Sequence, residues 1–160
     1  MEVRKTIATN SPQETQQLAQ KLIAKHLDEL KSKCLIFALE GELGSGKTQF
    51  VKGLGKALKI KQTIRSPTFT LVHEHPFGYP ASPKGMFYHV DAWRLSYPQE
   101  FLDLRLDKMI QPGNIIALEW ADKAKSTLEK VTKGKKVKII KLKFSHLNPK
   151  QRKIKITNED

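Results

Sequence analysis

Residues 35–48 read Leu-Ile-Phe-Ala-Leu-Glu-Gly-Glu-Leu-Gly-Ser-Gly-Lys-Thr, and this stretch decides the fold class. The apolar run from Leu35 to Leu39 predicts a strand that is buried on both faces. Gly41 to Thr48 then match the P-loop pattern, in which two glycines bracket four residues and are followed by Lys and Ser or Thr. The N–H groups of such a loop surround phosphate oxygens, and the positive end of the next helix adds to the attraction. We therefore predict a nucleotide site in which Lys47 reaches the β- and γ-phosphates and the Thr48 hydroxyl holds Mg²⁺.

Length and composition narrow the class of protein. We expect residues 1–160 to form a single P-loop ATPase domain with a substantial core. No apolar run is long enough to span a membrane, so no membrane association is expected. Cys34 is the only cysteine, which excludes an intrachain disulfide and is consistent with a reducing cytoplasm. The net charge of +13 favours an anionic partner such as RNA or an acidic protein surface.

Local patterns predict the first half of the fold. A helix should begin at Ser11, with Pro12 at its first position and Glu14 completing a capping box, and its apolar face should extend to Leu30. A second helix should follow the P-loop, weakened by two internal glycines. Next come a strand at 69–75, a loop at 76–85 and a strand at 86–91, and the two strands should be antiparallel neighbours.

The second half continues the alternation of helices and strands. We predict a helix from Ser96 to about Ile110, whose apolar face is formed by Leu102, Leu106, Met109 and Ile110. A doubly buried strand follows at 114–119, then a short helix with a Lys-rich loop, a strand at 137–144 with a bulge at Ile139-Ile140, and an exposed closing strand at 152–156. Together these elements predict an α/β fold, a P-loop NTPase-like three-layer sandwich with a mixed parallel and antiparallel central sheet.

Two carboxylates stand at predicted strand ends. Asp91 and Glu119 each follow an apolar run, and ligands of open α/β sheets lie at the carboxyl ends of the strands. Both are therefore candidates for holding Mg²⁺ or orienting a nucleophile, although a strand-end cap or salt bridge is an alternative for each. His89 shares a strand face with Asp91. The loop Ser66-Pro67-Thr68 is either a γ-phosphate contact or a plain turn.

Four segments together resemble the TsaE (YjeE) family. They are Gly41 to Thr48, Ser66 to Val72, His89 to Leu95 and the pair Glu119-Trp120, in the family's order and with compatible spacing. The resemblance covers nearly the whole chain, and only the P-loop is generic. The chain departs from the pattern at Ser45, at Ala92-Trp93 and at Arg105, where Ala, Leu-Tyr and Gly are more usual.

The resemblance implies a bacterial ATPase needed for the threonylcarbamoyl group on adenosine 37 of tRNAs reading codons that begin with adenine. It also implies TsaD and TsaB proteins as partners, with tRNA reached through their complex. Carried over by position, ATP or ADP would contact the segment Gly44, Ser45, Gly46, Lys47, Thr48 and Gln49. Mg²⁺ would be held by Thr48 and Glu119, with Asp91 ordering the metal or the attacking water. Family positions that touch nucleotide align with Glu14 and Arg152, although Glu14 is also the capping-box residue.

Three further predictions concern the surroundings of the site. Glu119, Asp91 and Lys47 are the candidate catalytic residues, and Trp120 should lie near the nucleotide because it directly follows Glu119. Thr68 is the candidate γ-phosphate contact. Eleven basic residues and no acidic one lie between Lys130 and Lys155, which indicates either a solvated strand face or a tRNA-contacting patch.

Two other classes of function share some of these features. A small-molecule kinase shares the P-loop but usually adds an acceptor pocket and an Arg-bearing lid, and the Pro- and Gly-rich segment 76–85 contains no Arg. A basic RNA-binding module with a residual nucleotide site should carry exposed aromatics for base stacking, yet Phe144 is the only aromatic residue after Lys130. The ATPase is therefore the preferred interpretation.

Overall fold

The computed structural model describes residues 3–67 and 69–159. Its strands form one seven-stranded sheet, in the order β1-β7-β6-β2-β5-β4-β3. The elements are β1 (Val3–Thr9), α1 (Pro12–Ala24), η1 (Leu27–Lys31), β2 (Cys34–Glu40), α2 (Lys47–Ala57), β3 (Val72–Tyr79), β4 (Ser82–Asp91), α3 (Pro98–Asp103), α4 (Leu106–Met109), β5 (Ile115–Glu119), η2 (Ala121–Ala124), α5 (Lys125–Thr132), β6 (Val137–His146) and β7 (Arg152–Glu159).

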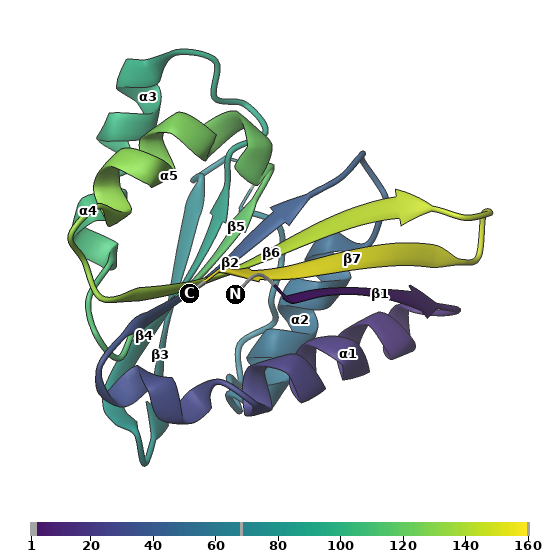
Figure 1. Ribbon diagram of the computed structural model, residues 1–160, viewed down its shortest axis with the longest axis horizontal. Helices are drawn as coiled ribbons and strands as arrows, with labels where there is room; N and C mark the ends of the chain where they lie inside the picture. Colours follow the sequence, from purple (N-terminus) through teal and green to yellow (C-terminus); the bar gives the residue numbers. More distant parts are fainter. Residues whose placement is uncertain (1–2, 68, 160) are drawn as a thin grey trace.

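The sheet combines parallel and antiparallel pairs. The central pairs β6–β2, β2–β5 and β5–β4 are parallel, whereas β1–β7, β7–β6 and β4–β3 are antiparallel. Helices α1 and α2 lie on one face of the sheet, and α3, α4 and α5 lie on the other (Figure 1). This arrangement confirms the predicted three-layer α/β sandwich with a mixed sheet.

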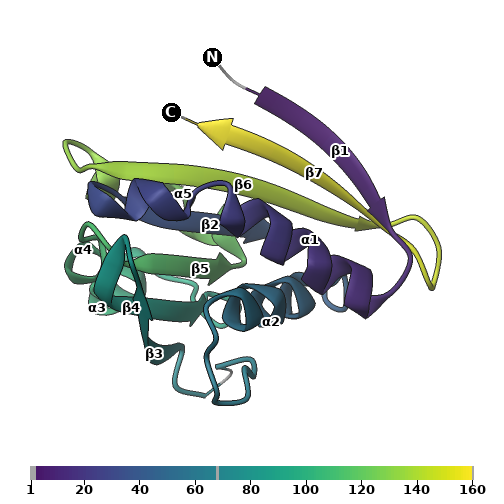
Figure 2. The same ribbon diagram turned by 90° about the horizontal axis from the view of Figure 1, so that it is seen from below.

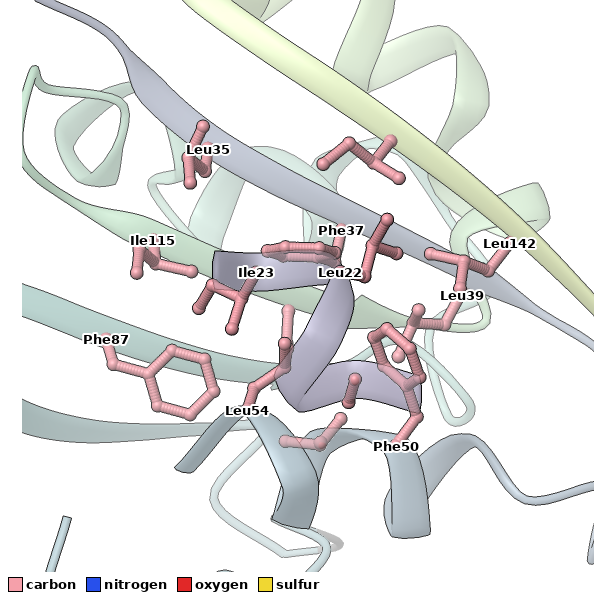
Figure 3. Packing of buried hydrophobic residues seen from close by; sticks show 14 of the residues in the cluster. Leu22, Ile23, Leu35, Phe37, Leu39, Phe50, Leu54, Phe87, Ile115 and Leu142 are labelled. Carbon is pink, nitrogen blue, oxygen red and sulfur yellow. The ribbon is translucent and has the colours of Figure 1, made fainter. Parts of the chain in front are cut away.

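Strand β2 lies between the two halves of the core because both of its faces are covered. Leu35, Phe37 and Leu39 point toward α1 and α2, where they pack with Phe50 and Leu54 (Figure 3). The alternate residues of β2 pack on the other face against the cluster that includes α5. An uninterrupted apolar run is what such a two-sided burial requires. No helix among the described residues has the length and apolar character needed to cross a membrane.

Helix α1 begins as predicted, but its capping box is displaced by one residue. The Ser11 hydroxyl accepts a hydrogen bond from the Glu14 N–H at 3.1 Å, as an N-cap should. The Glu14 carboxylate accepts from the backbone N–H of Asn10 at 2.7 Å instead of that of Ser11. The helix ends at Ala24, so Leu27 and Leu30 reach the core from η1 and do not extend the helix.

Helices α1 and α2 approach each other closely at Gly53, one of the two glycines predicted to weaken α2. A Cβ atom at this position would lie 2.3 Å from the backbone O of Gln16 and 2.7 Å from the Cβ of Ala19. The missing side chain therefore lets the two helices touch (Figure 2). A Cβ atom at Gly55 would likewise lie 2.8 Å from Cγ1 of the Ile64 side chain.

The predicted loop at 76–85 is wrong. Strand β3 continues through Pro76 to Tyr79, and β4 already begins at Ser82, so the two strands form a tight hairpin. The antiparallel pairing itself is confirmed. Proline is tolerated here because β3 is the edge strand of the sheet, where a missing N–H leaves no ladder bond unmade.

The predicted helix from Ser96 to Ile110 is also wrong in part, since it is broken into α3 and α4. Arg105 between them adopts a left-handed backbone conformation with φ of 57°, a conformation that glycine adopts more readily. The break rotates α3, so that Phe101 is buried and Leu102 is 51% exposed. Leu102 therefore does not belong to the apolar face that we predicted.

The last strands differ from the prediction in two respects. The pairing of β6 with β2 and β7 is continuous, without a bulge at Ile139-Ile140. No bulge is needed, because Ile140 packs under α1 and α2 while Ile139 packs against the opposite cluster. The closing strand is exposed on one face only, since Lys153 and Lys155 are exposed whereas Ile154 and Ile156 are buried. It lies between β6 and β1, so strand β1, which we did not predict, forms the edge of the sheet.

Candidate functional site

A cavity of about 670 Å³ opens at the carboxyl ends of β2, β4 and β5. The P-loop residues from Leu43 to Gln49 form one wall, and the carboxylates at the ends of β4 and β5 lie behind it. The first turn of α1 and the β6–β7 turn close the opposite side, through Asn10 and Arg152 among others. The volume suits a small-molecule ligand.

The P-loop presents backbone donors to this cavity. Gly44 and Gly46 have φ of 74° and 106°, in the left-handed region that favours glycine. The turn is fixed by a hydrogen bond from the Ser45 N–H to the Glu42 carbonyl at 3.1 Å. In the part of the chain that the structure describes, no residue accepts a hydrogen bond from the N–H groups of residues 46–49. The start of α2 therefore offers a row of donors with positive character.

Lys47 is buried, although the P-loop that carries it opens onto the cavity. Its ammonium donates to the backbone carbonyls of Gly41 at 2.6 Å and Glu42 at 2.9 Å, and it lies 4.2 Å from the ring centre of Trp120. Burial lowers the pKa of the Lys47 ammonium, and this effect is partly opposed by the carboxylates of Glu119, Asp91 and Asp122. The carbonyl groups of the P-loop thus hold the positively charged Lys47 side chain inside the loop.

Glu119 and Asp91 are direct neighbours, because they pair with each other at the ends of the parallel strands β5 and β4. Glu119 lies one strand nearer to the P-loop, since β5 is next to β2. Its Oε1 accepts a hydrogen bond from the Thr48 hydroxyl at 2.9 Å. The two predicted metal ligands therefore already touch.

Asp91 is held by different donors. Its Oδ1 accepts from the Trp93 N–H at 2.9 Å, and its Oδ2 accepts from the Ser66 hydroxyl at 2.9 Å. Ser66 therefore links the loop after α2 to the pair of carboxylates. From the sequence alone, this loop could also have been a turn without a role in the site. The predicted neighbour Thr68 lies outside the residues that the structure describes.

His89 fixes the second oxygen of Glu119. The His89 Nε2 lies 2.5 Å from Glu119 Oε2, and the imidazole ring is completely buried. The sequence predicted that His89 and Asp91 share a face of β4, because side chains alternate along a strand. It did not predict the contact with Glu119, because that residue belongs to the neighbouring strand β5. Within the described residues, the Nδ1 atom of His89 has no hydrogen-bond partner.

The remaining predicted residues divide into two groups. Ser45, Gln49, Trp120 and Arg152 line the cavity, and Arg152 donates to the Gly44 carbonyl at 3.2 Å. Glu14 does not line it, because its carboxylate is bound to the backbone and side chain of Asn10.

Several residues of the cavity wall were missed by the sequence analysis. Asn10 and Thr15 flank the start of α1, and Pro149 and Lys150 belong to the β6–β7 turn. Their only sequence signal was proximity to Glu14 and Arg152. Trp93 was considered only as a departure from the family pattern, yet it also lines the cavity, with its ring centre 4.4 Å from that of Trp120.

The residues present fit a nucleotide with Mg²⁺. The P-loop donors without described acceptors and the Lys47 ammonium suit phosphate oxygens. Oxygen atoms of Thr48, Glu119 and Asp91 are the type of ligand that Mg²⁺ prefers, and it is commonly held by one or two carboxylates together with the phosphates. No cluster of three or more His, Cys, Asp or Glu side chains in the described chain could bind a metal by itself.

Comparison with known proteins identifies relatives of this chain. Residues 9–154 match the model of a family described as threonylcarbamoyl adenosine biosynthesis protein TsaE. Curated relatives carry the name tRNA threonylcarbamoyladenosine biosynthesis protein TsaE, among them proteins of Aquifex aeolicus, Nostoc sp. and Bacillus subtilis. The Aquifex aeolicus protein is 36% identical over 127 residues, which is 78% of this chain and 83% of the relative.

The other two matches are shorter. The Nostoc sp. protein is 45% identical over 55% of this chain and 53% of its own length, so the chain spans about half of that relative. The Bacillus subtilis protein is 36% identical over 71% of this chain and 64% of its own length. The crystal structure of Bacillus subtilis YdiB has a TM-score of 0.62 at 24% identity, and the match covers 99% of this chain and 87% of that chain. This last likeness concerns the fold alone.

Proposed function

The chain belongs to the TsaE family, and we propose that it is a Mg²⁺-dependent ATPase acting in the formation of threonylcarbamoyladenosine on tRNA. Its partners would be TsaD-like and TsaB-like proteins, with the modified position adenosine 37. The names of the relatives supply the pathway. The observation that supports the nucleotide chemistry is the Thr48–Glu119 contact directly beneath the P-loop.

Each residue of the site would have a defined task. The N–H groups at the start of α2 would bind the β- and γ-phosphate oxygens. Lys47 would exchange its contacts with the Gly41 and Glu42 carbonyls for the phosphates, a short movement because the ammonium is already inside the loop. When bound, Mg²⁺ would neutralise developing charge on the phosphate oxygens. Thr48 and Glu119 would hold it.

The protein would also position the attacking water and exclude bulk solvent. Asp91 is 8% exposed and lies beside Glu119, so its carboxylate could accept a hydrogen bond from a water near the γ-phosphate. His89 would keep Glu119 in place when Thr48 turns from that carboxylate to the metal. The side chains of Trp93 and Trp120 would cover one side of the cavity.

The geometry favours ATP hydrolysis over small-molecule phosphorylation. The Pro- and Gly-rich segment 76–85 forms the β3–β4 hairpin, and β4 runs from this hairpin to Asp91 at the cavity. The hairpin therefore lies at the opposite end of the strand from the P-loop, where it cannot close over a second substrate. The segment 76–85 therefore supplies no lid for an acceptor molecule, which supports the ATPase proposal.

The test is phosphate release from ATP by the purified protein, with and without TsaD-like and TsaB-like partners and with a panel of hydroxyl acceptors. We expect Glu119→Gln to bind ATP but to lose roughly 10²–10³-fold in turnover. Asp91→Asn should lose less, and part of its loss should be recovered at high Mg²⁺. Full activity of both variants, or transfer of the phosphate to an acceptor instead of water, would refute the proposal.

A further inference from the structure

Part of one face of the sheet is left without a helix. On the inner side, Ile154 and Ile156 of β7 pack in the core formed with α1 and α2. On the other side, α3, α4 and α5 lie over β4, β5 and β2, and no helix of the described residues covers β7 and β1 (Figure 1). The outward residues of β1, β7 and the second half of β6 therefore form an open surface.

This open surface is basic, and we call it the lysine face. The exposed side chains of Lys143, Lys153 and Lys155 define it, since they alternate with the buried residues of β6 and β7. Within the described chain, no hydrogen bond or ion pair engages these three ammonium groups. The same surface includes further outward residues of the three strands. They are Lys141 and Ser145 of β6, Thr157 of β7, and Arg4, Thr6 and Ala8 of β1.

The arrangement of charges is not what a solvated strand face needs. Lys143 stands directly opposite Lys155, and like charges in this position destabilise a sheet. A face selected only for solubility would combine both signs, as opposite charges across strands contribute favourably. Among the described residues of this surface, the acidic positions are at its borders, where Glu40 of β2 pairs with Lys143 and Glu159 of β7 pairs with Ile139. The excess of positive charge between these borders therefore indicates a ligand.

We propose that the lysine face binds the phosphate backbone of folded RNA, and this inference rests on the proposed function in taking tRNA as that RNA. A protein partner is disfavoured, because protein interfaces are enriched in aromatic residues and depleted of Lys. Between its borders, the outward positions are instead Lys, Arg, Ser, Thr and Ala, which present charge without stacking surfaces. Such a surface reads backbone charge and not base sequence.

Spacing supports this ligand. Neighbouring strands are about 4.8 Å apart and alternate residues along a strand about 7 Å apart, so the ammonium groups form a grid with the spacing of several phosphates. Lys153 follows Arg152 in β7, but successive side chains of a strand point to opposite faces, so the lysine face and the cavity lie on opposite sides of the sheet. The two approach each other at the β6–β7 turn, where Lys150 lines the cavity. RNA bound there would lie close to the ATP site without entering it.

The experiment measures binding of a fluorescently labelled, unmodified tRNA transcript to the full chain by anisotropy in a KCl series. One variant combines Lys143→Gln, Lys153→Gln and Lys155→Gln. The matched control combines Lys31→Gln, Lys61→Gln and Lys84→Gln, which removes the same charge from exposed lysines on other elements. Equilibrium ATP binding and ATP turnover are measured for all three proteins.

The lysine-face variant should bind tRNA about tenfold or more weakly, and its slope of log Kd against log salt should fall by about 2 to 3. The control should stay within about twofold at 150 mM salt, where charges beyond roughly 8 Å are screened. Equal losses in both variants, or no tRNA binding by the parent, overturn the inference. So does a variant that keeps tRNA binding but loses a TsaD-like or TsaB-like partner. If ATP binding and turnover persist when any of these outcomes is observed, the proposed ATPase function stands and only the inference of RNA binding at the lysine face is refuted.

Discussion

Replacing Gly53 by alanine should weaken the fold even though alanine is the better helix former. Helix propensity alone predicts a gain of about 1 kcal/mol in the free energy of unfolding. The added Cβ, however, would lie 2.3 Å from the Gln16 carbonyl oxygen and 2.7 Å from the Ala19 Cβ. Backbone atoms cannot rotate away, so α1 and α2 must separate. We expect overpacking to cost about 3 kcal/mol, which leaves a net loss of about 2 kcal/mol.

The matched control is Gly55→Ala in the same helix. There the nearest atoms are Cγ1 and Cδ1 of Ile64, at 2.8 Å and 3.2 Å, and this side chain can change its rotamer. A cost of about 1 kcal/mol should cancel the propensity gain. Urea unfolding followed by far-UV circular dichroism measures both variants, and the difference between them is independent of propensity. The reasoning is refuted if Gly53→Ala is as stable as the parent, or if Gly55→Ala is the less stable variant.

Three further predictions concern single side chains. Lys47→Ala should weaken ATP binding or turnover by about tenfold or more, because it removes a buried ammonium from the phosphate position, and unchanged affinity and turnover would contradict the nucleotide assignment. In a Trp93→Phe background, ADP should change the fluorescence of Trp120, since the Lys47 ammonium that now lies 4.2 Å from that ring would move to the phosphates; a flat titration would mean that Trp120 is only a packing residue. Burial raises the pKa of the Cys34 thiol to about 12, so a disulfide reagent at pH 8 should label this thiol only when urea unfolds the protein, and rapid labelling of the native state would contradict its burial.

The centre of the fold was predictable because its signals are local. The apolar run of β2, the glycines of the P-loop and the helix after them are contiguous, and each segment specifies its own conformation. The adjacency of Asp91 and Glu119 was also predictable, because carboxyl ends of neighbouring strands meet at one edge of a sheet. The structure brings both residues to the P-loop, as that rule requires.

The errors arose where a distant partner decides the conformation. Strand β1 carries charged residues at Arg4 and Lys5 and becomes a strand because β7 pairs with it. Pro76 marks a loop in isolation but is accommodated at a sheet edge. The burial of Lys47 follows from the carbonyl groups of its own loop, a detail of backbone geometry that residue types do not encode.

The pairing of β1 with β7 also has a consequence for the order in which the protein matures during synthesis. Ile7 pairs with Ile154, so these strands are about 150 residues apart along the chain. Contacts of this range form late, and β1 must wait for β7 to leave the ribosome. The first turn of α1, which lines the nucleotide cavity, directly follows β1, so its N-terminal side is fixed only at that stage although the rest of α1 already packs on α2. We expect ribosome-bound chains stalled before Arg152 to retain ATP poorly in a filter assay, whereas chains that extend through β7 and an added linker should retain it. The nucleotide site would then become competent only after β7 has been synthesised.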